Sequence, residues 1–128
     1  MRLVVTLVMA LSLGGCIRMY AESTSTAPGA VGDDYAPRVS SGQARALVAR
    51  GALLLDVRSQ GEYALTHIDG ADNIPVEELG ARVHELGPDR DRPIVLYCMS
   101  GHRSSDAGRI LRRAGFTHVY DVGAMADY

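Results

Sequence analysis

The sequence of 128 residues contains only two cysteines, no lysine, no tryptophan and a net charge of only −2. Two cysteines cannot build a metal-binding cluster, and the four histidines lack the i, i+4 spacing of ligands on one helix, so we predict no metal and no cofactor. The weak charge is spread without blocks of one sign, which argues against a nucleic-acid partner. All thirteen basic residues are arginine, which we attribute to a GC-rich genome rather than to function.

No apolar run is long enough to span a bilayer. The longest, residues 3–13, follows Arg2 and is mostly apolar, which is typical of an export signal rather than of a membrane anchor. Its end resembles the bacterial lipoprotein signal, a Leu-Gly-Gly-Cys box that is cleaved before an acylated cysteine. The resemblance implies a signal peptide over residues 1–15 and a lipid on Cys16. The alternative is an ordinary signal peptide with an incidental cysteine.

The chain is thus expected to be exported and anchored by its lipid to the bacterial cell envelope, on the periplasmic face in a Gram-negative source. Residues 16–39 are rich in Ser, Thr, Ala, Pro and Gly, so we predict a flexible tether that cannot bury enough surface to fold. Residues 40–128 have room for a single domain, which we expect to be monomeric. With Cys16 acylated, Cys98 is the one remaining thiol, so no internal disulfide is expected.

Helical and strand patterns alternate from residue 40 onward. Two capping boxes, each a serine with Gln or Glu three residues later, predict helix starts after Ser40 and Ser59. Short and nearly continuous apolar runs are typical of strands covered on both faces. The expected helices lie within residues 40–51, 59–65, 76–86 and 104–115, and the expected strands within 52–57, 70–75, 93–97 and 117–121. This order predicts an α/β fold, a parallel β-sheet flanked by helices, with its site at the carboxyl ends of the strands.

The most informative segment follows the strand predicted at residues 93–97 and reads Cys98-Met99-Ser100-Gly101-His102-Arg103. A cysteine between a strand and a helix start meets loop N–H groups and the positive end of the helix dipole, and both stabilise a thiolate. We therefore predict that Cys98 is a nucleophile whose charge is held by amides of residues 99–103. Glycine at position 101 suits an inward-pointing N–H. The alternative is that Cys98 is only a small buried hydrophobe.

Several linked motifs resemble the rhodanese-like domain family. They are Asp56-Val57-Arg58, Glu62-Tyr63, His67-Ile68, Gly70-Ala71, Asn73-Ile74-Pro75, Cys98-x-x-Gly101-x-Arg103-Ser104 and Gly115-Phe116-x-x-Val119. The resemblance runs from about residue 40 to the last residue and is greatest to small exported single-domain thiosulfate sulfurtransferases. It implies a sulfane-sulfur donor such as thiosulfate, a persulfide on Cys98, and transfer to cyanide or a thiol acceptor.

Roles for the neighbouring residues follow from this resemblance. The substrate site is expected to comprise Asp56, Arg58 and the loop Met99, Ser100, Gly101, His102 and Arg103. Arg103 would brace the loop or attract the anionic donor, and Arg58 would do either or pair with Glu62. Asp56 would cap, pair with Arg58 or touch substrate. Of the histidines, His67 is expected to be structural, His84 and His118 to lie on the surface, and His102 to tune substrate choice or to be solvated.

Two other functions are open. Phosphatases and arsenate reductases of a related fold also use a cysteine loop, with the pattern Cys-x5-Arg. Arg103 gives Cys-x4-Arg here, and the shorter loop favours a sulfur substrate over a phosphate. A non-enzymatic module that carries sulfane sulfur or binds a partner is the second alternative.

Overall fold

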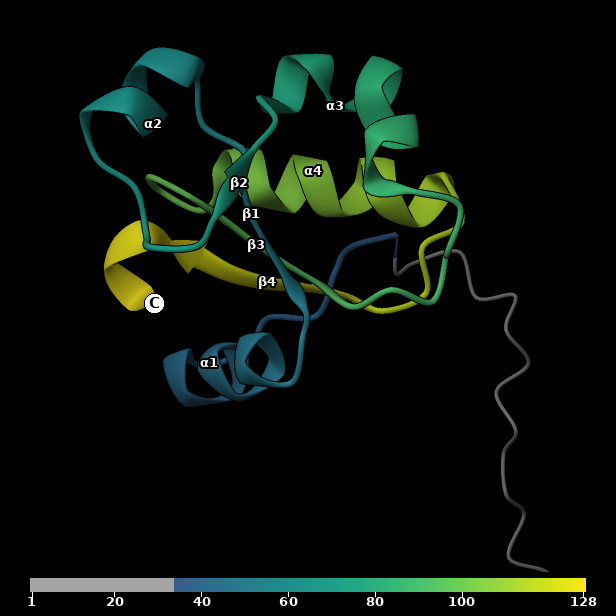
Figure 1. Cartoon of the computed structure of the whole chain (residues 1–128), viewed down its shortest axis with the longest axis horizontal. Helices are drawn as coiled ribbons and strands as arrows, with labels where there is room; N and C mark the ends of the chain where they lie inside the picture. Colours follow the sequence, from purple (N-terminus) through teal and green to yellow (C-terminus); the bar gives the residue numbers. More distant parts are fainter. Residues whose placement is uncertain (1–33) are drawn as a thin grey trace, which may run out of the picture. The chain divides into compact units, whose positions relative to one another are not determined.

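The computed structural model describes residues 34–128 (Figure 1). The predicted signal peptide, the predicted lipidation at Cys16 and most of the predicted tether lie outside the described residues. Within the described part, no helix has the length and apolar character needed to cross a membrane.

The described residues form one parallel sheet with helices on both faces, as predicted. The strands are β1 (Leu53–Asp56), β2 (Asp72–Asn73), β3 (Ile94–Cys98) and β4 (Val119–Ala124), in the order β2-β1-β3-β4. The helices are α1 (Ser41–Ala49), α2 (Gln60–Leu65), α3 (Val76–Arg82) and α4 (His102–Arg113), with 3-10 turns η1 (Val83–Leu86) and η2 (Met125–Asp127). In Figure 1, α1 lies below the sheet, whereas α3 and α4 lie above it.

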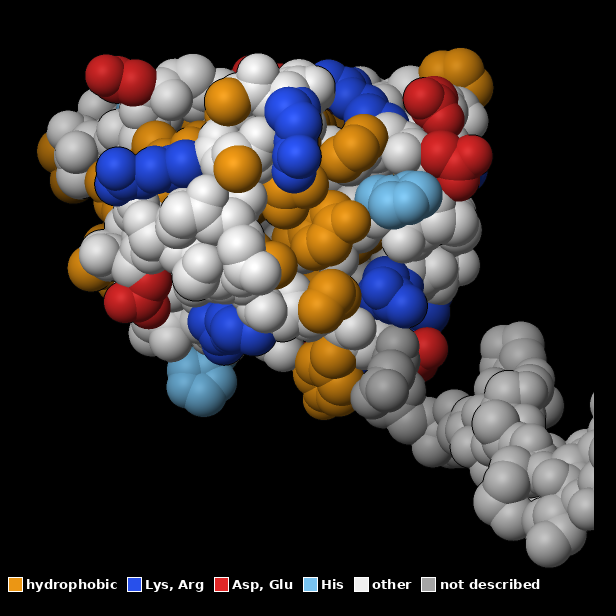
Figure 2. Space-filling view, turned by 90° about the horizontal axis from the view of Figure 1, so that it is seen from below, with side chains coloured by type: hydrophobic (Ala, Val, Ile, Leu, Met, Phe, Trp, Pro, Cys, Tyr) orange, Lys and Arg blue, Asp and Glu red, His pale blue; other side chains and the backbone are white. Residues whose placement is uncertain are grey.

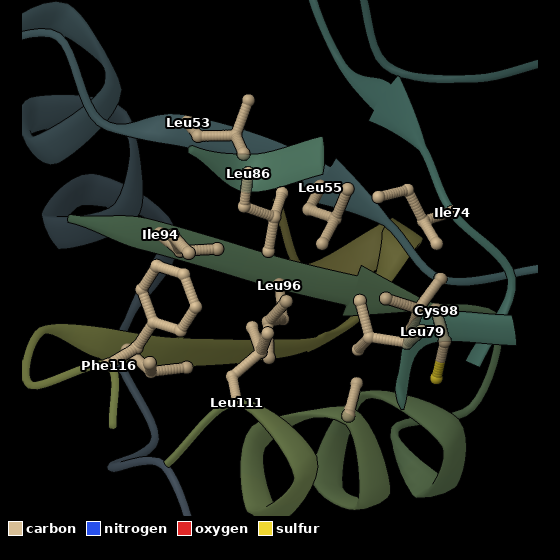
Figure 3. Close-up of a cluster of buried hydrophobic side chains, with 13 residues drawn as sticks. Leu53, Leu55, Ile74, Leu79, Leu86, Ile94, Leu96, Cys98, Leu111 and Phe116 are labelled. Atoms are coloured by element: carbon tan, nitrogen blue, oxygen red, sulfur yellow. The ribbon is translucent and has the colours of Figure 1, made fainter. Parts of the chain in front are cut away.

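The two central strands are buried on both faces, which explains their continuous apolar sequence. Alternate residues point to opposite sides: Leu55 and Leu96 join the cluster under α3 and α4, whereas Leu54 and Val95 join the cluster that contains Ala44 of α1. Figure 3 shows the first cluster, with the sulfur of Cys98 at the end nearest the start of α4. The carboxyl end of β3 therefore brings a thiol to the boundary between core and loop.

Apolar and arginine side chains are interspersed on the face of the molecule that carries α1 (Figure 2). A shallow hollow of about 260 Å³ lies there between α1 and β4, lined in part by Val39, Leu47 and Tyr120. It lies on the side of the sheet opposite α4.

Both predicted capping boxes are present. Ser40 and Ser59 each accept a hydrogen bond from the N–H three residues later. The side-chain oxygens of Gln43 and Glu62 in turn accept the N–H of Ser40 and of Ser59. Four boundaries differ from prediction. β3 ends at Cys98, one residue beyond the expected strand, and the helix expected over 76–86 tightens into a 3-10 turn from Val83. α4 begins two residues before the expected Ser104, and β4 runs three residues beyond the expected end at residue 121.

Two glycines account for the last two differences. Gly101, at φ 94°, occupies the N-cap position of α4, so the helix starts as soon as the chain leaves this left-handed conformation. Gly123, at φ 90°, lies where the register between β3 and β4 shifts, and this irregularity lets β4 continue to Ala124.

Residues 37–39 form a short extension of the sheet beside β4. The Asp121 N–H donates to the Pro37 carbonyl and the Val39 N–H donates to the Asp121 carbonyl, both at 3.0 Å. Ala36 packs against the cluster under α4. This part of the predicted tether thus belongs to the folded unit, and Pro37 is tolerated because its missing N–H falls outside the ladder.

Candidate active site

The loop after β3 closes back on the cysteine sulfur. The Gly101 N–H donates to Cys98 Sγ at 2.9 Å, and the Cys98 thiol donates to Ser104 Oγ at 3.6 Å. Ser104 Oγ in turn donates to the Gly101 carbonyl at 3.1 Å. Cys98 and Ser104 are both fully buried, so these polar contacts are shielded from water.

Convergence of several loop amides on the sulfur was expected, and the structure shows a smaller set. Among the described residues, Gly101 provides the one backbone N–H donor to Sγ. The loop turns its preceding residues outward, and Met99 and Ser100 are exposed. The prediction that amides from 99 to 103 all hold the sulfur is therefore wrong in this conformation, although the predicted inward N–H of Gly101 is present.

The sulfur also lies at the N-terminal end of a long helix. α4 has 12 residues, begins four residues after Cys98 and carries no acidic side chain in its first turn. The positive end of its dipole therefore faces the loop without a competing carboxylate from the first turn of α4, and such a field favours a thiolate over a thiol.

Arg103 ties the start of α4 to α2. Its Nη1 and Nη2 donate to the two carboxylate oxygens of Glu62 at 2.6 and 2.9 Å. Hydrogen bonds from Arg103, and next from the Ser59 backbone, lower the pKa of Glu62 from 4.5 to about 2, and the same ion pair raises the pKa of Arg103. The geometry fits the bracing role among the two that were considered for Arg103.

Asp56 and Arg58 pair with each other inside the protein. Arg58 Nη2 donates to Asp56 Oδ2 and to the Thr66 carbonyl, both at 2.6 Å, and the two side chains are 0 and 1% exposed. The hydrogen bond with Asp56 raises the pKa of Arg58. The predicted alternative of an Arg58–Glu62 ion pair is wrong, because Arg103 occupies Glu62.

The histidines take ordinary structural and surface positions. The His67 ring stacks on Tyr63 at 3.8 Å between centroids and its Nδ1 lies 2.8 Å from the Tyr63 carbonyl, as expected for a structural residue. His84, His102 and His118 are exposed. In the part of the chain that the structure describes, no group of three or more His, Cys, Asp or Glu side chains is placed to hold a metal ion.

Sequence reasoning missed two contributors to this site. Ser104 was noted as part of a motif but given no role, and Glu62 was considered as a capping residue, as part of a motif and as a partner of Arg58, but not as a partner of Arg103. The capping signal is local, whereas the contact with Arg103 spans 41 positions and has no local signature.

Comparison with known proteins agrees with this geometry. The rhodanese-like domain family matches residues 40–125. The chain is 37% identical over 73 residues to the thiosulfate sulfurtransferase PspE of Escherichia coli, covering 57% of this chain and 70% of that protein. It is 35% identical over 85 residues to the thiosulfate sulfurtransferase GlpE of Pseudomonas fluorescens, covering 66% and 76%.

Solved structures give the same result. The human single-domain sulfurtransferase TSTD1 superimposes with a TM-score of 0.61 at 35% identity, covering 73% of this chain and 92% of that one. A rhodanese from E. coli, solved with anions, gives a TM-score of 0.58 at 35% identity, covering 61% and 92%. With the matched region extending over the sheet, the cysteine loop and α4, the chain belongs to the rhodanese-like domain family.

Proposed function

We propose that this protein is a sulfurtransferase that moves a sulfane sulfur from thiosulfate, or a similar donor, to cyanide or a thiol through a persulfide on Cys98. The observation that carries the proposal is the Gly101 N–H, 2.9 Å from Sγ at the start of α4. A backbone donor and a helix dipole stabilise a negative sulfur, whether it is a thiolate or a persulfide. Two relatives named thiosulfate sulfurtransferases support the choice of donor.

The reaction would proceed in two displacements. The Cys98 thiolate attacks the outer sulfur of thiosulfate, a new S–S bond forms, and sulfite leaves with the electron pair of the broken bond. Cyanide or a thiolate then attacks the outer persulfide sulfur and returns the Cys98 thiolate. Covalent storage of the sulfur replaces one difficult transfer by two easier ones and predicts ping-pong kinetics.

Access to the sulfur requires motion of the loop. Cys98 is fully buried, whereas Met99 is 51% exposed and stands next to it in the chain. We infer that residues 99 and 100 move aside to admit the donor, while Gly101 keeps its N–H on the sulfur.

A phosphatase or arsenate reductase is less well supported. Such enzymes need cationic groups directed at a tetrahedral oxyanion, whereas the guanidinium of Arg103 is engaged in two hydrogen bonds with Glu62. The Cys-x4-Arg spacing of this chain is also one residue shorter than the Cys-x5-Arg pattern of those enzymes.

The cellular setting is a separate proposal from the sequence. We propose that residues 1–15 are removed, that Cys16 carries a lipid, and that a monomeric domain is held at the cell envelope. Mass spectrometry of the mature N-terminus tests the first two points, because an acylated Cys16 at position one has a distinct mass.

Thiocyanate formation from thiosulfate and cyanide tests the activity. The wild type is expected to turn over, Cys98→Ser to be inactive, and the donor-treated wild type alone to gain the mass of one sulfur atom. Equal activity in both proteins would rule out the mechanism. Addition of sulfur without transfer to cyanide or thiols would indicate a carrier, and phosphate release from an aryl phosphate would indicate the phosphatase class.

A further inference from the structure

We propose that Arg38 is a positioning residue for the cysteine loop, acting through Gly101. Only its effect on sulfur transfer rests on the function proposed above; its effect on the reactivity of Cys98 does not. Arg38 precedes the family match, which begins at residue 40, so this support comes from outside the matched domain.

The guanidinium of Arg38 occupies a slot made by two glycines. A Cβ added at Gly123 would overlap Arg38 Nη1 and lie 2.9 Å from Cζ. A Cβ added at Gly101 would lie 3.4 Å from Nη2, and 3.7 Å from the Cα of Gly123. The two glycine backbones are therefore neighbours. The planar guanidinium packs directly on Gly123, where any side chain would exclude it, and lies within ordinary contact distance of the Cβ position of Gly101.

A buried carboxylate sits beside the same slot. Arg38 Nη2 lies 3.8 Å from Asp121 Oδ2, and Asp121 Oδ1 accepts the Gly123 N–H at 2.8 Å. The side chain of Asp121 is 4% exposed. Asp121 thus holds one wall of the slot and attracts the cation, and the backbone bridge between Arg38 and Asp121 fixes the base of the side chain.

This packing reaches the sulfur through a single residue. Gly101 lies next to the guanidinium, because a Cβ added to it would be 3.4 Å from Nη2, and it donates its N–H to Cys98 Sγ at 2.9 Å. Gly101 also has a left-handed conformation, at φ 94°, which sets the direction of that N–H. A group packed against Gly101 limits how far the loop can move toward β4, so Arg38 keeps the N–H directed at the sulfur while the exposed residues 99 and 100 open.

The test is the pH profile of Cys98 alkylation by iodoacetamide in the full protein, with Arg38→Met compared with Arg50→Met. Arg50 is also an exposed arginine, at the end of α1, so the control removes the same charge elsewhere. We expect the midpoint to rise by about half a pH unit in Arg38→Met, because a weakened hydrogen bond no longer favours the thiolate. The Arg50 variant should match the wild type.

Gly123→Ala provides an independent readout, because its Cβ displaces the guanidinium. Its midpoint should also rise, and Arg38→Met combined with Gly123→Ala should shift no further than Arg38→Met alone. Should Arg38→Met fail to fold, Arg38→Lys, which keeps the charge but lacks the planar fork, is expected to give the same shift.

An unchanged midpoint in folded Arg38 variants, or fully additive shifts in the double variant, would overturn the proposal. A fall in thermal stability without a shifted midpoint would also overturn it, since that indicates a structural role only. Alkylation needs no sulfur donor, so an inactive wild type contradicts the sulfurtransferase proposal and leaves this measurement valid. If the wild type is active, thiocyanate formation by Arg38→Met should fall about fivefold.

Discussion

The Glu62 carboxylate binds both terminal nitrogens of Arg103, at 2.6 and 2.9 Å, and joins α2 to the start of α4. Glu62 also accepts the Ser59 N–H at the start of its own helix. One side chain therefore caps a helix and braces the cysteine loop, so its charge and its hydrogen-bonding shape can be separated by mutation.

Glu62→Gln keeps the capping shape and removes the charge. We expect the free energy of unfolding at neutral pH to fall by about 1 kcal/mol or less, because the ion pair is partly exposed. The folded pKa of about 2 lies below the usual 4.5, so the contribution is complete above pH 4.5 and is lost as the pH falls toward 2. Urea unfolding of the wild type and of Glu62→Gln between pH 5 and 2 tests this, because their free energies of unfolding should become equal as the pH falls. A difference in free energy that does not change with pH would contradict the prediction.

Asp56→Asn should destabilise the protein far more. It leaves the fully buried Arg58 guanidinium without its counter-charge, which costs about 3–5 kcal/mol. Replacing both residues, by Asp56→Leu with Arg58→Met, should cost much less than either single change. Urea unfolding checks this order. A stable Asp56→Asn with a raised KM for thiosulfate would instead indicate that the pair contacts the donor.

Gly101→Ala should weaken both the fold and the thiolate. Its φ of 94° costs a non-glycine residue about 1–2 kcal/mol, whereas the new methyl group would meet Arg38 at an ordinary contact distance of 3.4 Å, so the backbone conformation carries the effect. We expect a lower free energy of unfolding and a higher midpoint for Cys98 alkylation. Gly42→Ala is the matched control. Gly42 lies in α1, and nothing lies within 4 Å of the position that an added Cβ would take, so this substitution should be neutral or stabilising.

Ser104→Ala tests the hydroxyl under the loop. It removes the donor to the Gly101 carbonyl and the acceptor of the Cys98 thiol hydrogen, and should cost about 1–3 kcal/mol. The alkylation midpoint should fall, because the protonated thiol loses its hydrogen-bond acceptor. Ser105→Ala, at the next position of the helix, is the control and should change neither quantity appreciably. Equal effects of the two substitutions would argue against a specific role for Ser104.

The sheet and the starts of α1 and α2 were predictable because their signals are local. The runs in β1 and β3 are continuous because both faces are covered, and the capping boxes at Ser40 and Ser59 lie within four residues each. The position of Cys98 at a strand end before a helix followed from the same patterns. These features depend on neighbours in sequence.

The partners of the charged side chains were not predictable in this way. Glu62 had two arginines within reach of a plausible pairing, and only the folded structure, which brings Arg103 to Glu62 and pairs Arg58 with Asp56, decides between them. Arg38 lay in a segment of tether-like composition, and nothing local places it against Gly101 and Gly123. The number of amides that reach the sulfur likewise depends on the path of the loop, which composition does not encode.

The extension formed by residues 37–39 has a practical consequence for recombinant work. A chain trimmed at the family boundary, residue 40, would leave the outer backbone groups of β4 without their partners at Asp121. Bare strand edges invite pairing with another molecule, so such a fragment is liable to self-associate. Starting it at residue 34 retains the protecting segment and avoids mistaking an artefact of truncation for natural assembly.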